Sequence, residues 1–169
     1  MEYRWIEDAD KFKAISKQWD DALLLSKEDN PFLLSDFLMT WWKHYSRDLE
    51  FRIFILYHNG NIVGGLPLCQ NRKGYLEYPG GITANYTEPL LFKNNHAFWK
   101  YFLGSLNQLD GWRCTRLKRI RKRQLDAEQV NEIASEQKDI LLDLRKSDYA
   151  YLIDIPDNFS EYIQHIPKK

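Results

Sequence analysis

The sequence lacks most of the features that would place it in a specialised class of protein. Its 169 residues include two cysteines, which form no CxxC pair and have no metal-ligand spacing. No apolar run approaches the roughly 20 residues that a membrane-spanning helix needs, and no basic-then-apolar signal region follows Met1. These absences argue against a disulfide scaffold, a zinc-binding module and a membrane span. They predict a cytoplasmic protein in which Cys69 and Cys114 are buried free thiols.

Net charge is also missing, because 24 Lys and Arg residues balance 24 Asp and Glu residues. A neutral chain has no global field that attracts nucleic acid or an anionic membrane, so neither partner is expected. The hydrophobic share of 44% and the charged share of 28% fit one soluble globular domain. Aromatic residues are abundant at 15%, and we expect them mainly in the core and on helix-packing surfaces.

Hydrophobic periodicity predicts helices interspersed with strands. Capping residues place helices after Asp8, from Ser35 as the N-cap, after Asn94 or Asn95, and after Asp126. Strands are expected at 3–6, 51–57, 62–69, 75–78, 86–92, 112–120, 140–144 and 149–155, and a last helix near residue 159. The irregular order of these elements favours an α+β fold with a mixed, largely antiparallel sheet flanked by helices in a single domain.

The strongest local signal is the hairpin between residues 51 and 69. Asn59-Gly60 suits a type I′ turn, which needs positive φ at both central positions. Gly64-Gly65 predicts a kink or a close approach of another group to the backbone. Pro67 has no backbone donor and therefore predicts a bulge or a partly unpaired strand.

Several of these segments together resemble a known family. They are Pro31-Phe32 with Ser35 and Trp41-Trp42, the hairpin ending in Gly64-Gly65-Leu66-Pro67-Leu68, and, more loosely, Asn85-Tyr86-Thr87-Glu88-Pro89-Leu90. The order resembles the N-terminal half of the CelD-like and FemAB-like acyltransferases, which are tandem relatives of the GNAT acetyltransferase fold. Residues 151–162 are similar to the segment that leads into the second half of such proteins. The resemblance implies that 1–169 is one GNAT-like N-terminal subdomain, with residues from Phe159 onward beginning the connection to a missing second half.

The resemblance also implies an activity for the intact family. An acyl group would pass from acyl-CoA or a related carrier to an amine or hydroxyl of a cell-envelope or polysaccharide-related acceptor. GNAT enzymes hold the CoA pyrophosphate on a Gln/Arg-x-x-Gly-x-Gly/Ala loop at a helix N-terminus. The nearest match, residues 70–75, has Lys73 and Tyr75 where glycines are needed, so we expect a plain turn and no cofactor site in this chain. Alone, the chain is expected to fold without catalysing, and to pair with a second half or with another copy of itself.

The resemblance and the loop position make Asn85, Tyr86 and Glu88 the candidate substrate-binding residues. They lie in a break between predicted strands, beside Gly80-Gly81. Glu88 is the member that could serve as a general base. The alternative is that all three are ordinary turn and edge residues. No catalytic residue is assigned, and the four scattered histidines are expected at the surface rather than on a metal.

A second reading rests on the basic segment 113–123. Arg116, Arg119, Arg121 and Arg123 would bind an anionic ligand, such as the phosphates of RNA or of a nucleotide-linked sugar, in a non-catalytic binding module. The alternative is a solvated strand end whose charge is balanced by acids, namely Glu7, Asp8, Asp20 and Asp21. The sequence favours the solvated strand end over the anion-binding module, because the chain is neutral and shows no nucleic-acid-binding motif. A third reading is an interaction or assembly domain.

Overall fold

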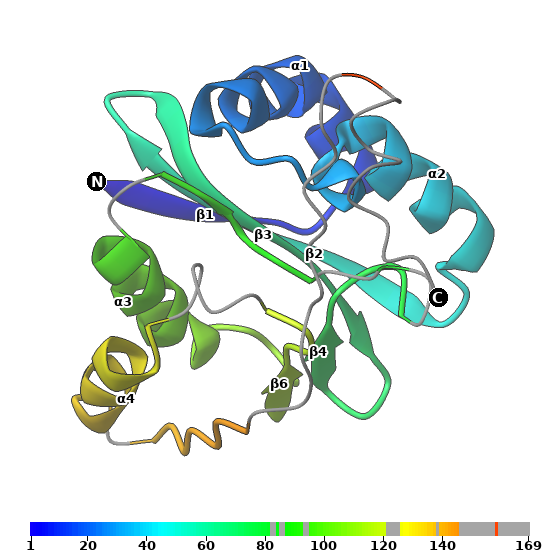
Figure 1. Ribbon diagram of the computed structural model, residues 1–169. Helices are drawn as coiled ribbons and strands as arrows, with labels where there is room; N and C mark the ends of the chain where they lie inside the picture. The colour runs from blue at the N-terminus through cyan, green and yellow to red at the C-terminus, as the bar shows by residue number, and fades with distance from the viewer. Residues whose placement is uncertain are drawn as a thin grey trace, which may run out of the picture.

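In the computed structural model, a mixed sheet lies between two layers of helices, with α1 and α2 on one face and α3 and α4 on the other (Figure 1). The structure describes residues 1–81, 84, 87–92, 95–120, 126–137, 139–145 and 158. In chain order the elements are β1 (Glu2–Ile6), α1 (Ala9–Ser26), the 3₁₀ helix η1 (Pro31–Leu33), α2 (Ser35–Tyr45), β2 (Leu49–His58), β3 (Asn61–Asn71), β4 (Tyr75–Glu77), β5 (Leu90–Leu91), α3 (Asn95–Leu106), β6 (Cys114–Arg116) and α4 (Ala127–Ser135).

The sheet has the order β1-β2-β3-β4-β6, and β5 pairs with β3 beside β4. Every described pair is antiparallel except β4 with β6, which run parallel. The chain returns from β4 to β6 through α3, as a parallel pair requires a crossover connection. The predicted α+β fold with a mixed, largely antiparallel sheet flanked by helices is confirmed.

The hairpin of β2 and β3 forms the centre of the sheet. Both strands are buried along most of their length, as predicted from their nearly unbroken apolar sequences. Asn59 and Gly60 have φ values of 50° and 78°, which confirms the predicted turn with two positive φ angles.

The glycine pair of β3 lies where helices press on both faces of the sheet. A Cβ on Gly65 would lie 2.3 Å from the ring of Trp19 in α1, and one on Gly64 would lie 2.6 Å from the ring of Phe98 in α3. The β2–β3 register also shifts beside Gly64, and the predicted close approach to the glycine pair is found. Pro67 lies between the part of β3 that pairs with β5 and the part that pairs with β4, which confirms the predicted partly unpaired strand.

The helix start at Ser35 is correct, but the predicted cap is wrong. Ser35 is the first residue of α2. The N-cap residue is Leu34, whose side chain makes no capping hydrogen bond. The carboxylate of Asp20 in α1 instead accepts the Ser35 amide at 2.9 Å and its hydroxyl at 2.6 Å. A tertiary contact therefore satisfies the helix N-terminus, and local sequence rules cannot anticipate such a contact.

Three further expectations change in the structure. The strands predicted at 86–92 and 112–120 shrink to β5 and β6, and residues 140–144 form no strand. Ile140 and Leu142 pack partly buried against the core and Leu141 is 97% exposed, so the side chains alternate, but the backbone pairs with no described strand. The strand predicted at 149–155 and the helix predicted near residue 159 lie outside the described residues. None of the helices in the described part of the chain combines the length and apolarity that crossing a bilayer requires.

Candidate functional site

The pairing of neighbouring strands changes from antiparallel to parallel at β4, and the candidate site lies where β4 ends. The sheet is antiparallel up to this strand, and β4 and β6 then run parallel, so their carboxyl ends point the same way. Ligands of open α/β sheets bind outside the carboxyl ends of parallel strands, at a switch in strand order. The described residues 78–81, 84 and 87–89 follow β4, and residues 117–120 follow β6, so these two groups border the candidate site.

A hydrogen bond between their residues ties these two segments together. The hydroxyl of Thr87 donates to the carbonyl oxygen of Lys118, and the Thr87 side chain is buried. The segment after β4 therefore packs against the segment after β6. Sequence reasoning noted Thr87 only as part of the resemblance and gave it no role.

Tyr78 is the first residue after β4 and is buried in this region. Its hydroxyl donates to the carbonyl oxygen of Phe32 at 3.2 Å. Burial, followed by the negative charge of Glu88, raises the pKa of Tyr78 well above the usual tyrosine value. The phenol is therefore a neutral hydrogen-bond donor at physiological pH. Sequence reasoning missed it, since an aromatic at a strand end reads as core.

Glu88 is completely buried, with no exposed surface, although it lies in a loop between two short strands. A carboxylate is rarely taken out of water without compensating interactions, so Glu88 is not a solvated loop residue. The negative charge of Glu88 also contributes to the raised pKa of Tyr78. The other two candidate substrate-binding residues, Asn85 and Tyr86, lie outside the described residues.

A third buried polar residue reaches the same backbone segment. Asn30 is 2% exposed, and its Oδ1 accepts the amide of Phe32, whose carbonyl accepts the Tyr78 hydroxyl. Gly80 continues the contact, since a Cβ on it would lie 2.6 Å from Ala84 and 3.5 Å from the ring of Phe37 in α2. The start of α2 therefore packs against the segment that follows β4.

The residues nearest to a CoA-binding motif do not fit a pyrophosphate. Oδ1 of Asn71 accepts the amides of Lys73 and Tyr75, and the Gly74 amide donates to the Asn71 carbonyl. These amides are used inside the turn that joins β3 to β4, and no helix starts there. The predicted plain turn is confirmed for these residues.

The basic segment is described up to residue 120. The guanidinium of Arg116 lies 4.1 Å from the centre of the Tyr75 ring and 4.0 Å from Glu77 Oε1, so it is engaged with β4. Arg119 is exposed and has a φ of 62°. Arg121 and Arg123 lie outside the described residues.

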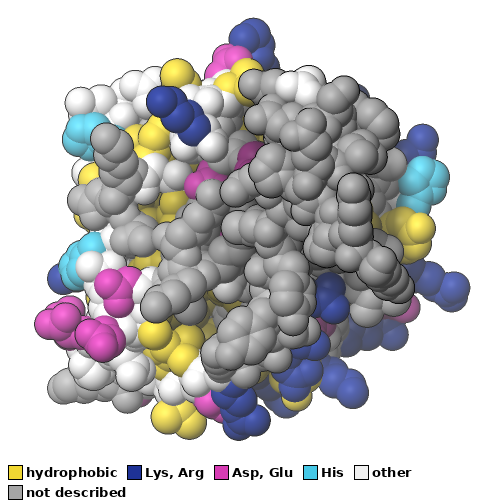
Figure 2. Space-filling model, viewed as in Figure 1, with side chains coloured by type: hydrophobic (Ala, Val, Ile, Leu, Met, Phe, Trp, Pro, Cys, Tyr) yellow, Lys and Arg dark blue, Asp and Glu magenta, His cyan; other side chains and the backbone are white. Residues whose placement is uncertain are grey.

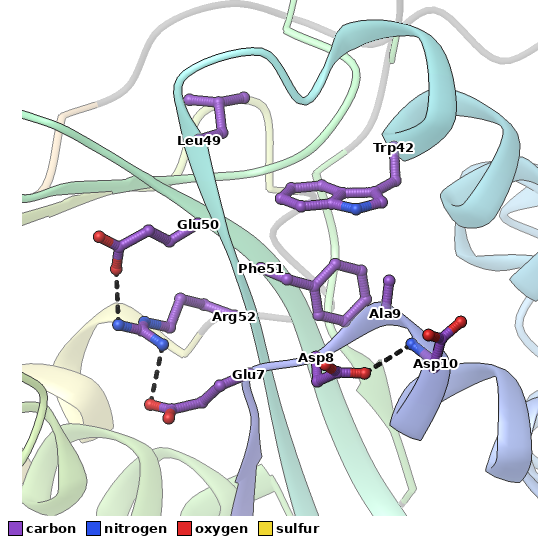
Figure 3. Close-up of a pocket in the computed structure, with 9 residues that line it drawn as sticks. All are labelled: Glu7, Asp8, Ala9, Asp10, Trp42, Leu49, Glu50, Phe51 and Arg52. Carbon is purple, nitrogen blue, oxygen red and sulfur yellow. Dashed lines mark hydrogen bonds and ion pairs between the residues drawn. The ribbon is translucent and has the colours of Figure 1, made fainter.

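A separate hollow of about 510 Å³ lies at the start of α1, where β2 extends beyond the end of β1 (Figure 3). The residues that line it are Glu7, Asp8, Ala9, Asp10, Trp42, Leu49, Glu50, Phe51 and Arg52. The Arg52 guanidinium is buried and pairs with Glu7 at 2.9 Å and with Glu50 at 2.7 Å. Its Nε also donates to Gln70 at 3.3 Å.

The polar groups of this hollow mostly serve the fold. Asp8 accepts the amides of Asp10 and Lys11 and so caps α1, as predicted. Arg52 neutralises two neighbouring carboxylates and links β2 to the β1–α1 connection. Within the described ranges, no group of three His, Cys, Asp or Glu side chains is arranged to hold a metal ion. We interpret the hollow as a structural ion-pair cluster.

The two cysteines are both free, as predicted. Cys69 is buried in β3, and burial, followed by the charge of Glu77, raises the pKa of its thiol to about 12. Such a thiol is inert as a nucleophile at neutral pH. Cys114 is only partly buried, so the prediction that both thiols are buried holds for one of them.

Comparison with known proteins gives a faint structural likeness. No protein-family model matches the chain. None of the curated proteins compared with it is similar to it. Among solved structures, it is similar to the aminoglycoside acetyltransferase meta-AAC0020 from an uncultured soil metagenomic sample, in complexes with sisomicin and with trehalose. In both cases the TM-score is 0.42 and the identity 13%, over 89% of this chain and 96% of the other.

A second likeness is to a structure described as a possible acetyltransferase from Clostridium difficile 630. Its TM-score is 0.39 and its identity 11%, over 90% of this chain and 99% of the other. The structures to which this chain is similar thus carry acetyltransferase descriptions. At these TM-scores and identities the likeness carries no argument about substrate, cofactor or mechanism.

Proposed function

We propose that this chain is the N-terminal subdomain of an acyltransferase of the CelD-like and FemAB-like kind. In the proposed reaction, a nitrogen or oxygen nucleophile of the acceptor attacks an acyl thioester or a related carrier. The new bond to the acyl carbon forms as the bond to the carrier breaks, and the proton of the nucleophile passes to a base. The acceptor is a cell-envelope or polysaccharide-related building block.

The observation that carries this proposal is the fully buried carboxylate of Glu88 in the loop between β4 and β5. A buried carboxylate beside a neutral phenol can orient a nucleophile and accept its proton. Its place beyond the parallel pair of β4 and β6 is where ligands of such sheets bind. Asn85 and Tyr86, which precede it, complete the proposed acceptor contacts.

We place the acyl-carrier contacts of the proposed reaction outside the turn that is nearest to a CoA-binding motif. The turn at residues 71–74 uses its amides internally, so we assign the acyl-CoA contacts to a second GNAT-like half. The chain alone is then expected to bind acceptor without turnover. A second half, or another copy of the chain, is the partner that would complete the site.

The acceptor site is tested by following glucosamine, which carries an amine and hydroxyls, in an NMR titration of the ¹⁵N-labelled chain. We expect saturable shifts around Tyr78 and Glu88, and at least about tenfold weaker binding for Glu88→Gln, since each lost bond to a charged group costs about 1.5 to 3 kcal/mol. Glu77→Gln, on the neighbouring strand, is the matched control. Thermal unfolding of both variants shows whether Glu88→Gln is folded, and shifts that this variant leaves unchanged would contradict the site.

The half-enzyme part of the proposal has its own test. The isolated chain is mixed with acetyl-CoA and glucosamine, and free thiol is measured over time. We expect no release of CoA above the rate without protein. Saturable turnover by the 169-residue chain would show that the chain needs no second half.

A further inference from the structure

The acids that were expected to balance the basic segment are all engaged elsewhere. Glu7 pairs with the buried arginine of the hollow, and Asp8 caps α1. Asp20 holds the N-terminus of α2, and Asp21 pairs with Lys17 at 2.9 Å. The basic residues described in segment 113–123 are exposed, as a solvated strand end requires, but the four acids expected to balance them have other partners.

The basic side chains of this region gather along one edge of the sheet. Within the described part of the chain, β6 pairs only with β4, so its other edge has no partner strand there. The turn between β3 and β4 adjoins it, because the Arg113 amide donates to the Gly74 carbonyl at 2.9 Å. We call five exposed cations on these segments the β6 cationic edge: Lys73, Arg113, Arg116, Lys118 and Arg119. Figure 2 shows Lys and Arg side chains collected at the lower right of the molecule, around the position of β4 and β6 in Figure 1.

Most of these cations have no counterion in the described structure. Arg116 is engaged with Tyr75 and Glu77. No described carboxylate forms an ion pair with the other four members of the edge. A row of unpaired cations beside a single acid produces a local positive field that the zero net charge conceals.

We propose that the β6 cationic edge binds the phosphates of a single-stranded nucleic acid. Four of the cations follow one another along residues 113–119, through the extended strand β6, and this linear order suits a chain of phosphates. Guanidinium groups match phosphate oxygens bidentately. Among the described residues, the large exposed hydrophobics lie on other segments, so the described part of this edge lacks the apolar anchors of a membrane-binding surface. They are Met1, Leu24, Leu25, Leu34, Tyr45, Leu141 and Leu144. The inference is independent of the proposed acyltransferase function.

Charged side chains on an edge strand have a second use, since they prevent edge-to-edge pairing of sheets. That role needs no affinity for phosphate, so a binding experiment separates the two. The full chain is titrated into a fluorescein-labelled oligouridylate RNA of about 12 nucleotides, and binding is followed by fluorescence anisotropy. If four cations each contact a phosphate, affinity falls roughly 50-fold between about 50 and 200 mM salt.

The decisive variant is the double substitution Arg113→Glu with Lys118→Glu. We expect at least about tenfold weaker RNA binding, because two phosphate contacts are lost and two repulsions are added. The control is Lys11→Glu with Lys13→Glu, which changes net charge equally at exposed positions on α1 and is expected to retain the affinity within about threefold. Equal losses in both double variants would overturn the proposal, and so would an absence of binding at low salt. Equally tight binding of polyglutamate or of phosphatidylserine vesicles would overturn the assignment to nucleic acid.

Discussion

Replacing Gly65 with alanine tests how tightly α1 packs on the centre of the sheet. The new Cβ would lie 2.3 Å from Cζ3 and 2.6 Å from Cη2 of Trp19, distances that real Cβ atoms essentially never show. Trp19 is fully buried, and its Nε1 donates to the Leu33 carbonyl at 2.7 Å. It also packs edge-on against Phe12 with ring centres 5.4 Å apart, so the indole cannot move without losing these contacts.

The expected cost of Gly65→Ala is about 3 kcal/mol of unfolding free energy. Overpacking a dense core costs about 1 to 3 kcal/mol, and weakening a buried hydrogen bond adds about 1 kcal/mol. Urea unfolding followed by tryptophan fluorescence measures it, as a lower midpoint at an unchanged slope. The matched control is Gly104→Ala in α3, where the nearest group lies 4.0 Å from the new Cβ, and the gain in helix propensity predicts a stabilisation of about 0.5 to 1 kcal/mol.

A double-mutant cycle isolates the contact. A phenylalanine at position 19 lacks the outer ring atoms that meet the new Cβ, so Gly65→Ala should cost at least about 1 kcal/mol less in a Trp19→Phe background. If Gly65→Ala costs the same in both backgrounds, the steric explanation is refuted. The same holds if Gly65→Ala and Gly104→Ala shift the midpoint in the same direction by similar amounts.

Three further predictions concern single groups. Asp20→Ala should lower the unfolding free energy by about 1 to 2 kcal/mol, because it removes the two hydrogen bonds at the start of α2. The control Asp21→Ala should leave the urea midpoint unchanged. Equal effects of the two substitutions would contradict the cap assignment. Because burial raises the pKa of the Cys69 thiol from 9.0 to about 12, the unfolded thiol ionises first as pH rises. The contribution of the neutral Cys69 thiol to the unfolding free energy should therefore be fully present below pH 9 and decline towards pH 12. Urea unfolding at alkaline pH should show a shallower decline for Cys69→Ala than for the unmodified protein. In the native protein an aromatic disulfide reagent should modify Cys114 before Cys69, as followed by mass spectrometry. Faster modification of Cys69 would contradict the burial of its thiol.

The resemblance and the structure contributed different residues to the proposed acceptor site. The resemblance directed attention to residues 85–88, and the structure buries Glu88 there completely. The partners Tyr78 and Asn30 could not be found from the sequence. Asn30 lies far along the chain from Glu88, and a tyrosine at the end of an apolar strand has the same pattern whether its hydroxyl is bonded or free.

The sequence by itself determined the elements whose signals are local. The turn at Asn59-Gly60, the caps at Asp8 and Asp126 and the buried central hairpin are fixed by φ preferences, side-chain acceptors and apolar runs, and all of them are found. The close approach at Gly64-Gly65 was also readable, because adjacent glycines in a strand leave room on both faces.

The tertiary structure alone decided everything that depends on distant partners. It gave the α2 cap to Asp20 and left residues 140–144 without a partner strand among the described residues. It also paired Glu7 with Arg52 and Asp21 with Lys17 rather than with the cations of segment 113–119, which a net charge of zero cannot reveal. Composition sums charge over the chain, whereas an electrostatic field depends on where the folded chain holds each charge, and only packing sets that position.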